Sequence, residues 1–156
     1  MHNGFVGGWP RLRRRIEGLI PDELYPARIG TTDSEALFLA ILGAGMDDPV
    51  AATESVLRTV TDMVNEVGQP LRFTAALSNG KDLYAFRYAA NDASNSLYFR
   101  ESALELLVVS EPLDSDPERW IAVPENSALI VHEGQRMTFR ELWSAESATP
   151  SRHVGT

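Results

Sequence analysis

Apolar residues recur at helical spacing throughout the first half of the chain. Between Pro10 and Pro21, leucine and isoleucine side chains fall three or four positions apart, which predicts a short amphipathic helix. A second helix is predicted to begin near Thr32, whose hydroxyl can cap free backbone N–H groups, with Glu35 three positions later as in a capping box. Residues 48–67 keep one face apolar and the other charged, which predicts a third helix.

The period changes after Pro70 to short runs rich in β-branched and aromatic residues. Runs 71–77 and 82–88 flank Ser78-Asn79-Gly80-Lys81, and an Asn-Gly pair between two such runs predicts a hairpin. Further strands are predicted at residues 96–100, 105–110, 120–123 and 128–132, and residues 137–142 add one more strand or a turn. Helices followed by an antiparallel meander place the chain in the α+β class.

Length and composition predict one domain. The chain has 156 residues, 44% of them hydrophobic, which suffices for one core and is too short for two ordinary domains. We assign residues 1–143 to that domain. Residues 144–156 contain Ser, Thr, Pro and Gly with almost no large apolar side chains, and we expect a disordered tail there.

Charge and hydropathy limit the partners. The net charge of −8 repels the phosphates of nucleic acids and anionic membrane surfaces. No apolar run approaches the roughly 20 residues that cross a bilayer, and the N-terminus shows no basic segment followed by a hydrophobic one. We therefore expect a cytoplasmic protein that binds neither nucleic acid nor membrane.

The chain contains no cysteine, which excludes disulfides, thiolate zinc sites and any mechanism in which this chain alone supplies a cysteine nucleophile. His2, His132 and His153 show no metal-ligand spacing. No glycine-rich phosphate-binding pattern is present. The sequence therefore predicts no metal and no cofactor.

Two short segments carry candidate chemistry. Asn3-Gly4 near the start is, taken alone, typical of a turn. Asp33, in the stretch Thr32-Asp33-Ser34-Glu35, is, taken alone, better explained as a helix N-cap or an acidic residue in the first turn of a helix, where the helix dipole favours negative charge.

Together, Asn3-Gly4, the following helix and Gly30-Thr31-Thr32-Asp33-Ser34-Glu35 resemble the class II glutamine amidotransferases, especially the stand-alone kind, over residues 1 to about 140. The resemblance implies part of an αββα sandwich of the N-terminal-nucleophile hydrolase type. It also implies that residues 1–4 end a core strand and that Asn3 and Gly4 form the oxyanion hole. A side-chain amide and a backbone N–H suit that task, since both are fixed neutral donors.

The resemblance assigns Asp33 to the α-amino group of the substrate glutamine, where a charge-assisted bond both orients the ligand and selects for a free amino-acid end. The family's nucleophile is an N-terminal cysteine whose own α-amine acts as base. Here His2 follows Met1 and cannot replace it. The cysteine, and the arginine expected to bind the substrate carboxylate, would lie upstream of Met1.

Two explanations remain open at this point: an internal methionine was taken as the start of a longer protein, or the chain is an inactive remnant. We expect the chain as given to be inactive alone, marginally stable and prone to self-association through exposed edge strands. Three functions remain open. They are glutamine-dependent amidotransfer, hydrolysis of a γ-glutamyl amide or peptide, and non-catalytic binding of an amino acid or a partner chain.

Overall fold

The computed structural model describes residues 1–102, 105–114, 116, 119–133 and 136–143. Its helices follow the predicted order: α1 (Trp9–Glu17), a short 3-10 turn (Tyr25–Ala27), α2 (Asp33–Ala44) and α3 (Pro49–Glu66). The strands are β1 (His2–Val6), β2 (Leu71–Ser78), β3 (Leu83–Ala90), β4 (Tyr98–Glu101), β5 (Leu106–Val109), β6 (Ile121–Ala122), β7 (Ser127–Val131) and β8 (Met137–Glu141). The predicted tail lies outside the described residues.

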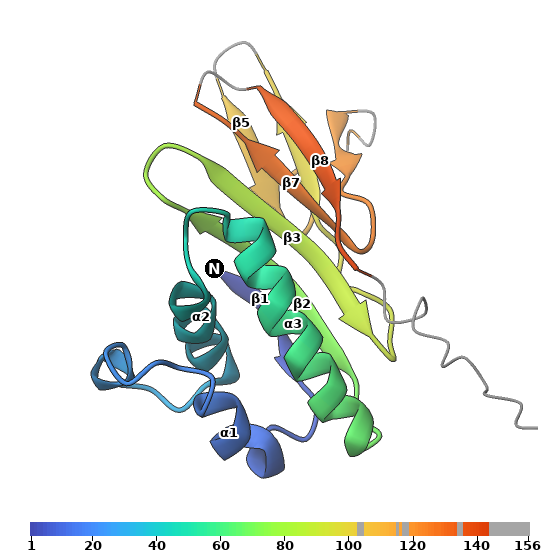
Figure 1. The fold of residues 1–156 in the computed structure, drawn as a ribbon. Coiled ribbons are helices and arrows are strands. Elements are labelled where there is room, and N and C mark those ends of the chain that lie inside the picture. Colours follow the sequence, from blue (N-terminus) through green and yellow to red (C-terminus); the bar gives the residue numbers. More distant parts are fainter. Residues whose placement is uncertain (103–104, 115, 117–118, 134–135, 144–156) are drawn as a thin grey trace, which may run out of the picture.

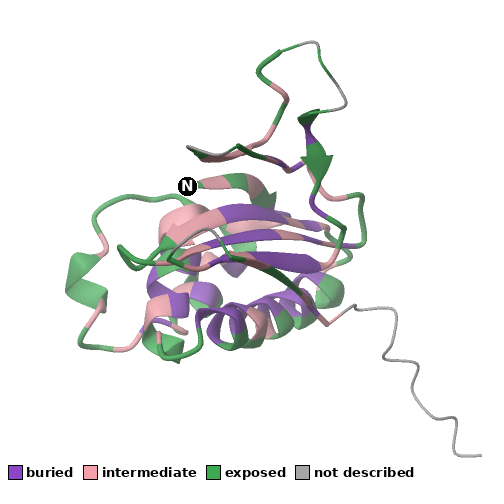
Figure 2. Cartoon of the chain, turned by 90° about the horizontal axis from the view of Figure 1, so that it is seen from above, coloured by how far each residue is buried: buried purple, intermediate pink, exposed green. Residues whose placement is uncertain are grey.

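Three helices cover one face of a five-stranded antiparallel sheet with strand order β1-β2-β3-β7-β8 (Figures 1 and 2). The main core lies between these two layers, and its fully buried side chains include Leu12 and Ile16 of α1, Ile41 of α2, Val60 of α3 and Phe86 of β3. The α+β assignment is therefore confirmed, with strand β1 first, the helices next and the other antiparallel strands after them.

The strands that follow the helices are antiparallel, as expected, but they divide between two sheets. Strands β4, β5 and β6 leave the main sheet and form a three-stranded sheet of order β5-β4-β6, while β3 pairs directly with β7. The reason is that β3 is apolar on both faces. Its Phe86 faces the helices, whereas Ala85 joins Leu97, Phe99 and Leu129 in a second buried cluster under the small sheet.

The predicted hairpin is confirmed. Strands β2 and β3 pair from Leu71↔Ala90 to Ser78↔Leu83. Gly80 has a φ of 89°, which an L side chain rarely adopts, and the Asn79 side-chain oxygen accepts hydrogen bonds from the backbone of Lys81 (3.0 Å) and Asp82 (2.7 Å). The Asn-Gly pair therefore fixes the turn in the way the sequence indicates.

Strand β1 is the outer strand of the described sheet rather than an interior one. Among the described strands it pairs only with β2, and its register runs from His2↔Ala75 to Val6↔Leu71. Helix α2 packs beside β1, so the helix layer extends to this edge of the sheet (Figure 1). Among the described residues, no helix is long and apolar enough to cross a membrane.

One buried hydrogen bond joins the helix layer to the sheet and supports a stability prediction. The Thr61 hydroxyl of α3 lies 2.9 Å from the Tyr88 hydroxyl of β3, and both residues are almost fully buried. Thr61→Val should lower the free energy of unfolding by about 1–3 kcal/mol, because it leaves the Tyr88 hydroxyl buried without a partner. Chemical denaturation would measure the loss.

The same helix provides the matched control. Thr53 is also fully buried, but its hydroxyl has no hydrogen-bond partner among the described residues. Thr53→Val should therefore leave the free energy of unfolding unchanged or raise it. Equal losses in the two valine variants would show that the Thr61–Tyr88 bond contributes nothing specific.

Candidate functional site

The pairing of β1 with β2 determines which way each backbone group of β1 points. Met1 and Ala76 exchange two hydrogen bonds of 2.9 Å, and the Gly7 amide donates to the Pro70 carbonyl at 2.8 Å. Because bonding alternates along an antiparallel pair, the backbone groups of odd-numbered β1 residues point toward β2. Those of His2, Gly4 and Val6 point outward, to the open edge of the sheet.

Asp33 meets this open edge from the first turn of α2. Its Oδ2 accepts the Val6 amide proton at 2.7 Å, and its Oδ1 accepts from the Ser34 amide at 2.8 Å. The side chain therefore joins the N-terminus of α2 to β1. It lies at the same edge as the outward-pointing Gly4 amide, which is about 7 Å along the strand from that of Val6.

Gly4 is required by the space available at this point of β1. A Cβ atom at this position would overlap the Arg72 carbonyl oxygen and lie 2.6 Å from Nε2 of His2. Any larger residue would push β1 away from β2. The sequence indicated Gly4 only through the family motif, and the structure adds this steric reason.

Asn3 alternates with Gly4 and places its side chain on the other face of β1, away from the helices. The residue is exposed, and its side-chain oxygen lies 3.4 Å from Nδ2 of Asn95. The structure places Gly4 and Asp33 on the same edge, whereas the Asn3 side chain lies on the opposite face of β1 from the helices.

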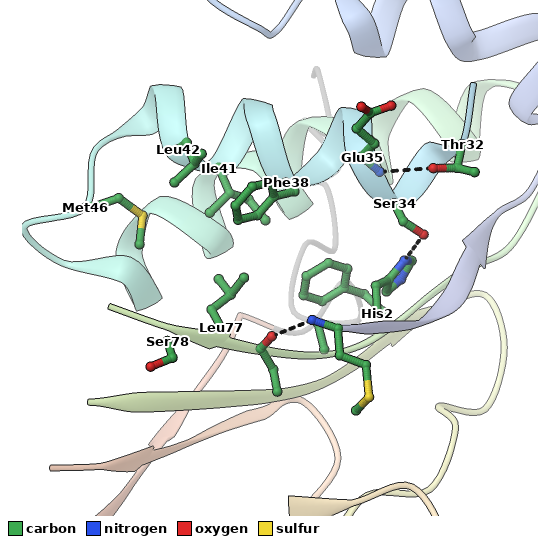
Figure 3. A pocket seen from close by; sticks show the side chains of 14 residues that line it. His2, Thr32, Ser34, Glu35, Phe38, Ile41, Leu42, Met46, Leu77 and Ser78 are labelled. Atoms are coloured by element: carbon green, nitrogen blue, oxygen red, sulfur yellow. Dashed lines mark hydrogen bonds between the residues drawn. The ribbon is translucent and has the colours of Figure 1, made fainter. Parts of the chain in front are cut away.

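His2 is a residue of this edge whose role the sequence reasoning missed. Its Nδ1 lies 2.7 Å from the Ser34 hydroxyl, and its ring packs 5.1 Å from that of Phe73 (Figure 3). Its Nε2 is buried without a hydrogen-bond partner among the described residues. Burial lowers the pKa of His2 below its usual 6.5, although the Asp33 carboxylate and the Arg72 carbonyl oppose this shift. His2 is therefore a neutral imidazole at pH 7.

The loop before α2 is held by a buried cation. The Arg28 side chain is only 5% exposed and pairs with Glu17 of α1 at 2.8 Å and with Glu35 of α2. Glu35 also accepts from the amides of Ile29 (2.9 Å) and Gly30 (2.8 Å), and these bonds lower its pKa. These contacts fix the path by which the chain reaches Asp33.

The capping box predicted for α2 is half correct. The Thr32 hydroxyl accepts from the Glu35 amide at 3.3 Å, as expected. The returning contact differs, because the Glu35 carboxylate binds the amides of Ile29 and Gly30 and the guanidinium of Arg28. An arginine seven positions upstream competes for that carboxylate, so Glu35 serves the loop instead of the cap.

A pocket of about 540 Å³ opens between α2 and β2, beside the start of β1 (Figure 3). Its lining is mainly apolar and includes Phe38 and Leu42 of α2 and Leu77 of β2, with His2 and Ser34 at one end. Asn3, Gly4 and Asp33 do not line it. The volume suits a small ligand, but the candidate donors and the carboxylate lie at the sheet edge beside this pocket.

No group of three or more histidine, aspartate or glutamate side chains in the described part of the chain is arranged to hold a metal ion. The chemistry available at the edge is that of a carboxylate, two neutral donors and an uncharged imidazole.

Comparison with known families decides the relationship. A family model described as "Glutamine amidotransferases class-II" matches residues 14–101, which is more than half of the chain. The chain belongs to this family. The matched range contains Asp33, whereas Asn3 and Gly4 lie outside it.

Two relatives show how much of the family this chain represents. The probable glutamine amidotransferase DUG3 of Saccharomyces cerevisiae is 29% identical over 173 residues, covering 84% of this chain and 48% of the yeast protein. The solved structure of a glutamine aminotransferase class-II domain protein from Silicibacter pomeroyi has a TM-score of 0.83 and 33% identity, covering 92% of this chain and 67% of that one. The chain thus spans about half the length of the yeast relative.

The buried His2 predicts an acid-dependent loss of stability. Its folded-state pKa lies below 6.5, so the unfolded state binds more protons as pH falls past this value. The contribution of the buried neutral His2 to the free energy of unfolding is therefore complete above pH 6.5, and it is lost as the pH falls through the folded-state pKa. His2→Asn should flatten the dependence of the free energy of unfolding on pH between 6.5 and 4.5, above the range where Glu35 and Glu17 titrate.

Denaturant unfolding at a series of pH values would measure this slope. Ser34→Ala is the control, since it removes the Nδ1 partner but leaves the imidazole buried, and should retain the slope. A slope unchanged by His2→Asn would assign the acid sensitivity to other groups.

Proposed function

We propose that this chain carries the substrate-amine and oxyanion positions of a site that hydrolyses the γ-amide of glutamine. The observation that supports this most directly is the placement of the Asp33 carboxylate and the outward Gly4 amide on one edge of β1. A carboxylate and an N–H donor, separated by about two residues of strand, match the two ends of a small amino acid that carries an ammonium and a carboxamide.

Asp33 is proposed to bind the α-amino group. Its Oδ2 accepts one bond, from Val6, and its Oδ1 accepts the Ser34 amide at 2.8 Å and a longer bond from the Ser34 hydroxyl at 3.4 Å. An ionised carboxylate offers about four lone-pair sites, so acceptor capacity remains for an ammonium. The two backbone bonds hold the carboxylate in place before any ligand arrives, which reduces the entropy lost on binding.

Asn3 and Gly4 are proposed to form the oxyanion hole. Attack on a carboxamide places negative charge on its oxygen, and two fixed neutral donors stabilise that charge without a proton transfer. The Gly4 amide points away from β2 to the open edge, and the Asn3 side chain lies next to it along the strand. Both donors therefore come from consecutive residues of one rigid element.

The nucleophile is not among the 156 residues, since the chain has no cysteine. In the proposed reaction a thiolate attacks the amide carbon, ammonia leaves, and water hydrolyses the γ-glutamyl thioester. That thiolate has to come from a cysteine outside this sequence. We accordingly propose that the chain is inactive alone and acts as part of a larger amidotransferase or γ-glutamyl hydrolase.

A second function, non-catalytic binding of an amino acid, is favoured by the missing cysteine alone. It uses the same Asp33 position but gives Asn3 and Gly4 no chemical role. Both proposals predict binding of glutamine, and they differ in whether the carboxamide end is recognised.

Glutamine binding by this chain should depend on the ammonium group. In an NMR titration, L-glutamine should shift the Val6 and Ser34 amides, with a Kd in the millimolar range, equivalent to roughly −4 kcal/mol. Asp33→Asn should weaken binding about tenfold or more, because a bond to a charged group contributes roughly 1.5–3 kcal/mol. The isosteric amide has one acceptor oxygen, which can still accept from Val6 and keep the link between β1 and α2, while the Ser34 amide loses its acceptor.

Asp62→Asn, an exposed change on α3 with the same loss of charge, is the control and should bind as the wild type does. Glutaramate, which is glutamine without its α-amino group, should bind wild type and Asp33→Asn equally weakly. Equal affinity of the wild type for glutamine and glutaramate would contradict the role of Asp33. Shifts at Val6 and Ser34 without any at Gly4 would favour the non-catalytic function.

The chain alone should release no ammonia from glutamine above the uncatalysed background, because no residue in it supplies the thiolate. A coupled glutamate dehydrogenase assay on wild type and on Asn3→Ala would measure this. Turnover that Asn3→Ala abolishes would show that the chain holds its own nucleophile and would overturn the proposed division of the site.

A further inference from the structure

The loop between β3 and β4 reaches back across the exposed face of β1. Its residue Asn95 lies against Asn3, although the two are 92 positions apart in the sequence. Nδ2 of Asn95 is 3.2 Å from the Asn3 carbonyl oxygen and 3.4 Å from the Asn3 side-chain oxygen. Neither the motif near Asn3 nor any helical or strand pattern marks Asn95 for this position.

Hydrogen-bonding capacity determines which way the Asn95 amide faces. Nη1 of Arg72 lies 3.4 Å from the Asn95 side chain, and a guanidinium can only donate. The oxygen of the Asn95 amide must therefore face Arg72. Its NH₂ group then faces Asn3, whose side-chain oxygen accepts, and the Asn3 NH₂ group is directed away from the loop.

Arg72 is itself held in position. Its Nε donates to Asp92 at 2.8 Å, and its guanidinium lies over the Phe5 ring at 5.6 Å. The Asn95 main chain is fixed too, since its carbonyl oxygen accepts from Nε of Arg87 at 3.0 Å and from the Thr74 hydroxyl at 3.4 Å. A series of donors and acceptors thus runs from Asp92 through Arg72 and Asn95 to Asn3.

We propose that Asn95 is a positioning residue that orients the Asn3 side-chain amide with its NH₂ group toward the open side of β1. The need for such a residue is physical: the two ends of an amide have nearly the same shape, and the terminal torsion of asparagine is broad and roughly two-fold. Asn3 is exposed, so packing does not choose between its two orientations. A fixed donor at Asn95 does.

The consequence for the reaction rests on the proposed function. In the orientation that Asn95 selects, Asn3 presents a donor to the site where negative charge develops. In the opposite orientation it would present a carbonyl oxygen, which repels that charge. Asn95 thereby acts on the chemistry without touching the substrate.

Side-chain amide NMR of the free chain tests the orientation without any ligand. In the wild type, the Asn95 NH₂ protons should show NOEs to Asn3 and exchange with water severalfold more slowly than the Asn3 NH₂ protons. Slower exchange of the Asn3 NH₂ group in the wild type would overturn the proposal, and this measurement requires no variant to fold.

The variant Asn95→Asp keeps the side-chain shape but replaces the donor by an acceptor. The Asn3 amide should then reverse, so that its own NH₂ protons become the slowly exchanging ones. Ser96→Ala is the matched control, because Ser96 is the next residue of the loop and its hydroxyl donates to Glu111 rather than to Asn3. Exchange at Asn3 that is the same in Asn95→Asp and Ser96→Ala would also contradict the proposal.

Addition of L-glutamine separates this inference from the proposed function. Wild type and Ser96→Ala should show ligand-induced shifts of the Asn3 NH₂ signals, and Asn95→Asp should lose them while retaining those of Val6 and Ser34. If exchange reverses as expected but glutamine shifts no signal in any form, the positioning role stands and the glutamine site fails. If the Asn3 shifts persist in Asn95→Asp, the positioning role fails.

Discussion

A single carboxylate at the start of α2 determines the geometry of the whole sheet edge. The Asp33–Val6 bond of 2.7 Å joins a helix terminus to the backbone of β1. It sets the distance between the N-terminus of α2 and the outer strand. Together with the contact between His2 of β1 and the Ser34 hydroxyl of α2 at 2.7 Å, it fixes the two candidate donors of β1 relative to α2.

The loop that leads to Asp33 is held by a second group of charged side chains, Arg28 with Glu17 and Glu35. Arg28 is nearly inaccessible and lies between Glu17 and Glu35, so it connects the first two helices through the loop that leads to Asp33. A buried ion cluster of this kind contributes more to defining one loop conformation than to net stability, since desolvation offsets much of the attraction. These contacts hold the loop that positions Asp33, and the charges of Arg28, Glu17 and Glu35 are paired with one another.

Local patterns were sufficient for the helices and for the hairpin. Asp48 caps α3 through the amides of Val50 and Ala51, and Asn79-Gly80 forms the turn, because both signals act over three or four residues. The division into two sheets was not predictable in this way, since it depends on which buried face of β3 each later strand covers. The outer position of β1 likewise depends on which strands pair with one another, and the sequence of residues 2–6 alone does not indicate it.

The candidate site shows the same limit. Asp33 and Asn3-Gly4 were identified through a family motif, and no physical property of those short segments distinguishes them from a helix start and a turn. His2 and Asn95 were missed because their roles arise from contacts across 32 and 92 positions. A buried histidine nitrogen and an oriented amide become visible only when the strand, the helix and the loop are placed together.

The bond from Val6 to Asp33 has a further consequence for how this edge meets other chains. A carboxylate in the plane of an outer strand occupies the donor that an added strand would need, and charged groups at such edges discourage unlimited sheet growth. Any strand that joins β1 must therefore stop short of Val6. Replacing Asp33 by a side chain without an acceptor would free the Val6 amide and remove this barrier to strand addition, so one side chain both ties β1 to α2 and limits how far another strand can extend along β1.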